Sequence, residues 1–186
     1  GLYEQIQRDA FLIFWLNALT PPQIDPETVP DEDFQRLHRE SLRYGFETFY
    51  LNITSDIGVP AIAAVIRDAS GCGPRLSLGA GCNANPIIAL NSALEEAWSV
   101  YHLMRPSQSS YGLSSSYRPF KDNINQSERL RLWANPSMEE KFLFFLAGEK
   151  ERIADRAFSC PAYFASEKEG LRFLTGHMEQ RGEGYE

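Results

Sequence analysis

The chain has 186 residues, of which 43% are apolar and 23% charged, and its formal net charge is −7. This composition, with 12 Phe and 8 Tyr, supports a folded core and excludes a largely disordered chain. An acidic chain in which lysines and arginines are never clustered also lacks the positive surface of a non-specific nucleic-acid binder.

The cysteines and the apolar runs indicate a cytoplasmic protein that is not bound to a membrane. Cys72, Cys82 and Cys160 are odd in number and lack C-x-x-C spacing, so free thiols in a reducing cytosol are favoured over disulfides or a zinc site. The longest apolar run, residues 10–16, is far shorter than the roughly 20 residues that span a bilayer, and it lacks the flanks of a signal peptide.

The first predicted element is a helix over residues 2–19, which ends before Pro21 and Pro22. Its apolar residues between 10 and 16 surround the whole circumference, which predicts burial on all sides. A helix that begins without a capping residue, and a tail at 182–186 that directly follows another predicted helix, make us expect a chain cut from a longer protein.

A second helix is expected after a proline-rich connector over residues 21–30. Asp31 is suited to cap it, and the helix should extend to about Tyr44 and end at Gly45. Three apolar residues stand at core spacing in this helix: Phe34, Leu37 and Leu42.

Three strands then follow in a predicted antiparallel meander with short turns. Residues 46–53 alternate apolar and polar side chains, whereas residues 59–67 form the continuous apolar run of a buried strand. A third strand is predicted over residues 75–78, ended by Gly79-Ala80-Gly81 as a tight turn. A glycine turn before a helix binds anions in some proteins, but no GxGxxG and no Walker lysine accompany it here, so a simple chain reversal is favoured.

The second half of the chain is expected to be helical around one long loop. Asn85 and Pro86 begin a helix that extends to Met104, and residues 105–135 form a polar loop that is either functional or disordered. Helices are predicted over residues 138–147 and from a Ser166 cap to about residue 180. These elements indicate an α/β (α+β) fold with a small, mostly antiparallel sheet packed by helices.

The chemistry-bearing pattern lies on the first helix, where Glu4, Gln7 and Arg8 share one face by their i, i+3, i+4 spacing. Spacing alone favours a plain Glu4–Arg8 salt bridge. The alternative is a carboxylate directed at a cation and a guanidinium directed at a phosphate, as in sites where carboxylates hold Mg²⁺ on nucleotide phosphates.

Other polar residues give weaker signals. Glu95 and Glu96 lie in the middle of the long helix, where packing would turn one inward, but their composition favours solvation of both. We expect His38, His102 and His177 to be surface or capping residues, because none has metal-ligand spacing. Cys82 is interpreted as a buried thiol, since no base stands near it in the sequence.

Three blocks resemble one known family in the right order. GLYEQIQRDAFLIFWLN is similar to the YcaO helix that reads roughly GLLELIERDAFxxWW, and TSDIGVPAIAAVIRD is similar to the family's T-S-D-x-G-x-P followed by an apolar strand. LGAGCNANPIIALNSALEEAW resembles the family's GxGxxxxPxxALxxALxEAxQ segment. The resemblance covers nearly all of residues 1–104, and residues 136–186 are compatible with it as a helical C-terminal part.

The resemblance implies an enzyme that uses ATP and Mg²⁺ to phosphorylate backbone amide oxygens. Such enzymes convert Cys, Ser or Thr of a precursor peptide to azolines, as in bacteriocin biosynthesis, or form thioamides or amidines. By position, Glu4 falls on a Mg²⁺–ATP ligand and Arg8 on a phosphate contact, while Gln7 stands where the family has a second Glu. Glu96 matches the Glu of ALxEAxQ, and the resemblance implies a supporting role for it in cofactor binding, with Ser99 in place of the usual Gln.

Several family features have no counterpart in this chain. The resemblance implies a further carboxylate pair upstream of the first helix, and no matching block precedes Gly1. We therefore expect a single partial domain over residues 1–186, the C-terminal portion of a YcaO-like domain, that binds ATP weakly or not at all when alone. The implied partners are a precursor peptide or protein substrate and an E1-like or TfuA-like protein, and a truncated domain favours a homodimer. The alternative is a degenerate scaffold without catalysis that binds a peptide or partner protein.

Overall fold

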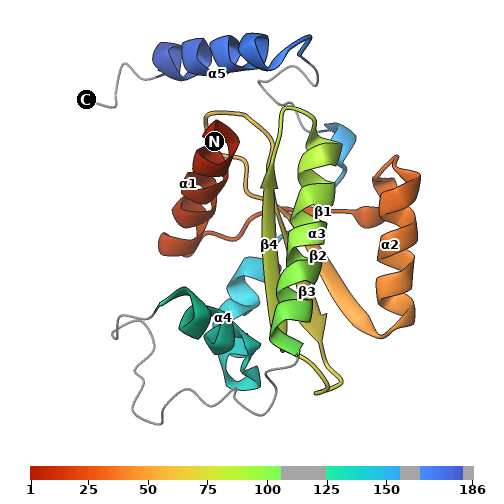
Figure 1. Ribbon diagram of the computed structural model, residues 1–186. Helices are drawn as coiled ribbons and strands as arrows, with labels where there is room; N and C mark the ends of the chain where they lie inside the picture. Colours follow the sequence, from red (N-terminus) through yellow and green to blue (C-terminus); the bar gives the residue numbers. More distant parts are fainter. Residues whose placement is uncertain (106–124, 156–163, 182–186) are drawn as a thin grey trace.

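The computed structural model describes residues 1–105, 125–155 and 164–181 as a mixed α/β arrangement (Figure 1). The helices are α1 (Leu2–Leu16), α2 (Glu32–Arg43), α3 (Pro86–Met104), α4 (Gln126–Ala134) and α5 (Glu167–Arg181). The strands are β1 (Gln23–Ile24), β2 (Phe46–Asn52), β3 (Ala61–Asp68), β4 (Leu76–Cys82) and β5 (Lys150–Glu151). Short 3₁₀ segments are η1 (Pro26–Thr28), η3 (Pro136–Leu146) and η4 (Ile153–Asp155).

The five strands form one sheet in the order β4-β3-β2-β1-β5, which confirms the predicted α/β class and the meander. β2, β3 and β4 pair antiparallel, with Val65 opposite both Phe49 and Leu78. β1 pairs antiparallel with β2 and parallel with β5, so the sheet is mostly antiparallel. β1 and β5 are only two residues long and were not predicted.

Helices cover both faces of this sheet. On one face, α2 and α3 bury Ile62, Ala64 and Ile66 of β3. On the other face, α1 and η3 bury the alternate residues Ala61, Ala63 and Val65. Because neighbouring side chains of a strand point to opposite faces, the continuous apolar run of β3 supplies both cores.

An aromatic cluster fixes α1 to the C-terminal elements. Trp15 lies between Trp133 of α4 and the phenylalanines of η3, with ring centroids 5.1 Å from Trp133 and 5.6 Å from Phe145. Phe11 adds an edge-to-face contact with Phe145 at 5.5 Å. Rings packed in this way stabilise beyond their buried area, so α1, α4 and η3 form one layer.

The prediction that α1 is buried on all sides is wrong. Ile6 and Ala10 are buried against the sheet, whereas Leu12, Ile13 and Leu16 are exposed, Leu16 by 75%. Hydrophobicity all around a helix is typical of burial on every side, but the described residues cover α1 on one side only.

α1 also ends three residues earlier than predicted, at Leu16. The amide of Leu19 donates to the carbonyl of Phe14 at 2.9 Å and that of Ala18 to Trp15 at 3.2 Å, which is the pattern of a Schellman motif. Ala18 has a φ of 51°, a conformation usually left to glycine. The helix end carried no glycine signal and was therefore missed.

The second helix begins and ends as predicted. The Asp31 carboxylate accepts from the amide of Phe34 at 2.8 Å, and Gly45 follows the helix with a φ of 80°. Phe34 is fully buried and Leu37 partly so, but Leu42 is 49% exposed, which contradicts its predicted core position.

The predicted glycine turn is also wrong, because Gly79, Ala80 and Gly81 lie inside β4. A Cβ on Gly79 would collide with the backbone of α3 at Ala93 and Ala97, and one on Gly81 with that at Ala89. These two glycines therefore allow α3 to contact the strand directly. α3 itself is confirmed, with the Asn85 side chain capping it and Pro86 in its first turn.

Further along the chain, α4 occupies residues that were predicted to be loop, and residues 106–124 of that predicted loop lie outside the described part. The helix predicted over residues 138–147 is a 3₁₀ helix, η3. α5 is confirmed from its Ser166 cap, whose hydroxyl accepts from the amide of Glu169 at 3.2 Å. No helix among residues 1–105, 125–155 and 164–181 has the length and apolar character needed to cross a membrane.

Candidate functional site

The three family-like blocks meet in one buried cluster. Ile6 of α1, Val59 of the β2–β3 turn and Ala84 before α3 are each at most 3% exposed and pack together with Leu174 of α5. Figure 1 shows α5 lying across the end of the molecule where α1 and α3 begin. Blocks that are distant in sequence therefore build one region around the start of α1.

The β2–β3 turn has its own internal support. The Thr54 hydroxyl accepts from the amide of Ala61 at 3.1 Å, and the Asn52 side chain accepts from the amide of Thr54 at 3.1 Å. Gly58 takes a φ of 75° in this turn. His177 of α5 is hydrogen-bonded to the carbonyl of Ile57 at 2.7 Å, so it links α5 to the turn.

Glu4 stands on the open side of α1, with 83% of its side chain exposed. Its carboxylate contacts the ammonium group of Gly1, and this hydrogen bond and positive charge lower the pKa of Glu4. The Glu4–Arg8 salt bridge favoured by spacing alone does not form. Glu4 is therefore an accessible carboxylate at the first turn of a helix.

Arg8 is held by neighbours other than Glu4. Its guanidinium donates to the side-chain oxygen of Gln5 and lies 3.9 Å from the Asp9 carboxylate, and 66% of the arginine side chain is exposed. Gln5 in turn donates to Asp9 at 2.8 Å. These contacts hold the Arg8 guanidinium along the exposed face of α1, where an anion can reach it.

Gln7 is half-buried between this exposed face and the side of α1 that packs on the sheet. Its amide oxygen and the Glu4 carboxylate stand one helical turn apart, and both are the hard oxygen donors that Mg²⁺ prefers. Within residues 1–105, 125–155 and 164–181, no group of three or more His, Cys, Asp and Glu side chains is arranged to hold a metal ion. The donor set on α1 thus fits two ligands of a Mg²⁺–nucleotide, with the remaining ligands to come from elsewhere.

Glu96 lies on α3, which covers the face of the sheet opposite α1, and among the described residues its hydrogen bond is to β4 and not to the three candidate residues of α1. Both Glu95 and Glu96 are exposed, as their composition predicted. The Glu96 carboxylate nevertheless accepts from the amide of Ala80 at 2.7 Å. Glu96 therefore ties α3 to the outer edge of β4, and its predicted part in cofactor binding stays a prediction.

The histidine prediction is wrong for His38, which is 4% exposed. Its Nδ1 atom lies 3.0 Å from the Thr48 hydroxyl and 3.1 Å from the Tyr50 hydroxyl, and its ring stacks on Phe34. Burial lowers the pKa of His38 and raises the pKa of Tyr50 to about 12. A lone histidine in a polar helix gave no signal of this burial.

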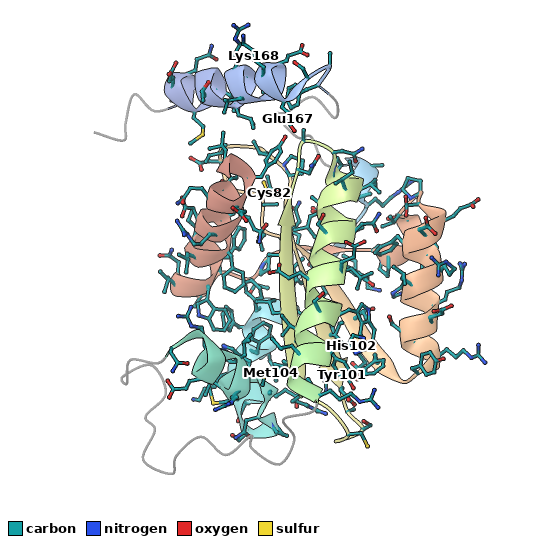
Figure 2. The ribbon with its side chains drawn as sticks, in the orientation of Figure 1. Cys82, Tyr101, His102, Met104, Glu167 and Lys168 are labelled. Atoms are coloured by element: carbon teal, nitrogen blue, oxygen red, sulfur yellow. The ribbon has the colours of Figure 1, made fainter. Side chains whose placement is uncertain are left out.

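The structure describes two of the three cysteines. Cys72 is exposed, and Cys82 is partly buried on β4 beside α1 (Figure 2). Cys160 lies outside the described residues. Figure 2 also places Tyr101 and His102 at the far end of α3, where they belong to a groove that sequence reasoning missed.

Comparison with known proteins shows which family this chain is similar to. The family model described as YcaO cyclodehydratase, ATP- and Mg²⁺-binding, matches residues 1–184. An uncharacterized protein in the tfuA 3′ region of Rhizobium leguminosarum bv. trifolii is 32% identical in an alignment of 111 residues that covers 52% of this chain and 25% of that protein. The matched part of the chain thus spans about a quarter of the length of these curated relatives.

Solved structures share the fold. A heterocyclase in complex with substrate and cofactor superposes with a TM-score of 0.70 at 21% identity, over 98% of this chain and 22% of that chain. YcaO from Methanopyrus kandleri, bound with AMPPCP and Mg²⁺, superposes with a TM-score of 0.59 at 20% identity, over 98% of this chain and 43% of that chain. The match over residues 1–184 is decisive, and the chain belongs to the YcaO family.

Proposed function

We propose that this chain contributes the exposed face of α1 to the Mg²⁺–ATP site of an enzyme that activates peptide backbone amides. The observation that supports it most directly is the joint exposure of Glu4 and Arg8 on the helix that resembles the family's E-x-x-E-R segment. A buried ion pair between Glu4 and Arg8 would instead have indicated a purely structural role for this helix.

The proposed roles follow from the chemistry of each side chain. Glu4 and the amide oxygen of Gln7 would hold Mg²⁺, and the planar fork of Arg8 would hold phosphate oxygens. When bound, ATP supplies the phosphoryl group that makes an amide oxygen a good leaving group. Arg8 would offset charge on the phosphate during transfer, and Asp9 and Gln5 would keep its guanidinium in place.

The same proposal assigns the remaining half of the site to parts of a longer protein. Two ligands of one helix are too few for a hard cation that takes six oxygens, and the matched part of this chain covers only 25% of the Rhizobium relative. A calorimetric titration of the 186-residue chain with Mg²⁺–ATP is expected to show weak binding or none. Micromolar affinity in that titration would contradict the division of the site.

Arg8→Ala tests the activity in the full-length protein that contains this segment. With the precursor peptide and the partner protein present, the product is read by mass spectrometry as the loss of one water per ring, and ATP hydrolysis is followed in parallel. We expect the variant to lose at least about tenfold of the ATPase rate, because one charged transition-state contact is removed. Arg36→Ala is the matched control, since Arg36 is an exposed helical arginine whose ion pair is with the neighbouring Asp33.

Gln7 supports a second candidate function, a scaffold of the same fold without catalysis. With an amide in place of a carboxylate at this position, a Mg²⁺ site has one negative charge fewer. If Gln7 is a ligand, Gln7→Glu will shift the Mg²⁺ dependence of the reaction. If the protein is a scaffold, neither form will hydrolyse ATP or change the mass of a precursor peptide.

The proposed substrate is a precursor peptide or protein in the cytoplasm, with azoline or thioamide formation as the reaction. The position of the Rhizobium relative in the tfuA 3′ region supports a TfuA-like partner. Binding of an E1-like protein instead would favour the azoline-forming branch.

A further inference from the structure

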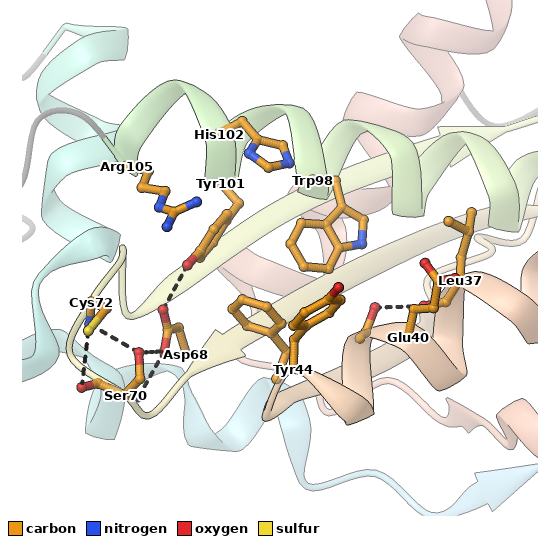
Figure 3. Close-up of a pocket in the computed structure, with 12 residues that line it drawn as sticks. Leu37, Glu40, Tyr44, Asp68, Ser70, Cys72, Trp98, Tyr101, His102 and Arg105 are labelled. Carbon is orange, nitrogen blue, oxygen red and sulfur yellow. Dashed lines mark hydrogen bonds between the residues drawn. The ribbon is translucent and has the colours of Figure 1, made fainter.

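An aromatic groove opens on the side of the sheet that α2 and α3 cover, near the C-terminal ends of α2, α3 and β3 (Figure 3). Its volume is about 610 Å³, within the usual range for binding pockets. Residues from four segments line it, including Glu40, Phe46, Trp98, Tyr101, His102 and Arg105. The groove lies on the face opposite α1, so it is separate from the proposed nucleotide site.

The floor of the groove is a set of rings locked edge to face. The ring centroid of Phe46 lies 5.0 Å from Trp98 and 5.1 Å from Tyr101, and Trp98 lies 5.4 Å from Tyr101. Asp68, which is 2% exposed, fixes this floor from below because its carboxylate accepts from the Tyr101 hydroxyl at 2.9 Å. Rings that are already immobile lose little freedom when a partner packs on them.

Charges of opposite sign stand at the two ends of this floor. Figure 3 shows Arg105 at one end and Glu40 at the other, with Trp98 and Tyr44 between them. Both charged side chains belong to exposed residues. Within the described part of the chain, the ion pairs join other groups, so Arg105 and Glu40 have their charges available.

We propose that this groove binds an extended peptide segment in which an apolar or aromatic side chain is flanked by an acidic residue and a basic residue. The apolar side chain would pack on Trp98, the acidic one would meet Arg105, and the basic one would meet Glu40. Aromatic and arginine side chains dominate the energetics of such contacts. Charges placed apart along a groove match side chains along an extended chain better than they match one compact ligand.

Nuclear magnetic resonance on the full 186-residue chain tests this binding. The probe is a short synthetic peptide with glutamate, a central phenylalanine and lysine, and the readout is the indole N–H signal of Trp98, assigned with Trp98→Phe. Trp15 and Trp133 are internal controls, because they pack together in the cluster on the other face of the sheet. We expect a saturable shift of the Trp98 signal while those of Trp15 and Trp133 stay in place.

Charge reversal then tests the orientation of the peptide. Arg105→Glu is expected to weaken binding several-fold, and a peptide with lysine in place of its glutamate is expected to recover the loss. Arg129→Glu, at an exposed arginine of α4 that does not line the groove, should bind as the parent does. An unmoved Trp98 signal, or equal affinity of the parent and Arg105→Glu, would overturn the proposal. Neither measurement uses ATP. A negative result would therefore contradict the peptide groove without contradicting the proposed nucleotide site on α1.

Discussion

Gly79→Ala is expected to destabilise the protein more than most single-methyl additions. The new Cβ would lie closer than 3.0 Å to the carbonyl of Ala93, the amide of Ala97 and the carbonyl carbon of Glu96. All three are backbone atoms of α3, so no side chain can rotate away and the helix itself must move off β4. Overpacking of this kind costs about 3 kcal/mol. For a chain of this size, that corresponds to a fall in Tm of roughly 6–12 °C.

Gly176→Ala is the matched control. It adds the same methyl group in the interior of α5, where nothing lies within 4 Å of the new Cβ. Alanine is the better helix former, so this variant should gain about 0.5–1 kcal/mol. Both variants are compared with the parent by thermal and urea unfolding followed by circular dichroism. A Gly79→Ala variant that melts within about 2 °C of the parent would refute the close packing of α3 on β4.

Three further predictions concern stability. Burial of His38 lowers its pKa, so the unfolded chain binds a proton that the folded protein does not. The free energy of unfolding of the parent should therefore fall as pH drops below about 6.5, by up to about 1.4 kcal/mol per pH unit. In urea titrations at several pH values, His38→Gln should show a weaker dependence on pH. Glu139 accepts from half-buried Arg75 at 2.6 Å and forms an ion pair with half-buried Arg67 at 2.7 Å, so Glu139→Gln should cost about 2 kcal/mol in the same assay, whereas the exposed neighbour Glu140→Gln should cost almost nothing. Ala18→Gly should raise the free energy of unfolding by about 1 kcal/mol, because glycine takes a positive φ without strain; a loss would contradict the motif at the end of α1.

The sequence predicted those elements whose local signals agreed with their tertiary role. α2 and α3 carry caps that satisfy the first amides of each helix, and the alternation in β2 and the apolar run of β3 define the meander. Gly79 and Gly81 were misread because glycine serves two needs, a turn and a close approach of backbones. Only the position of α3 above β4 tells them apart.

The candidate site was predictable to the extent that helical periodicity decides it. The spacing of Glu4, Gln7 and Arg8 places them together, but their partners depend on which neighbours exist: Glu4 pairs with Gly1, and Arg8 with Gln5 and Asp9. The aromatic groove escaped prediction because Phe46, Trp98 and Tyr101 are apolar residues from different elements. Their spacing resembles ordinary core positions, and only the assembled sheet shows that they form a surface.

The contact between Glu96 and Ala80 also limits how copies of this protein can associate. β4 is the last strand of the sheet, and a free edge strand is a template onto which another strand can add. The Glu96 carboxylate occupies one outward amide of that edge and places a negative charge beside it. A strand from another molecule would have to displace this carboxylate, so growth of the sheet through β4 is discouraged. We therefore expect Glu96, which links α3 to the sheet, to oppose aggregation through this edge as well.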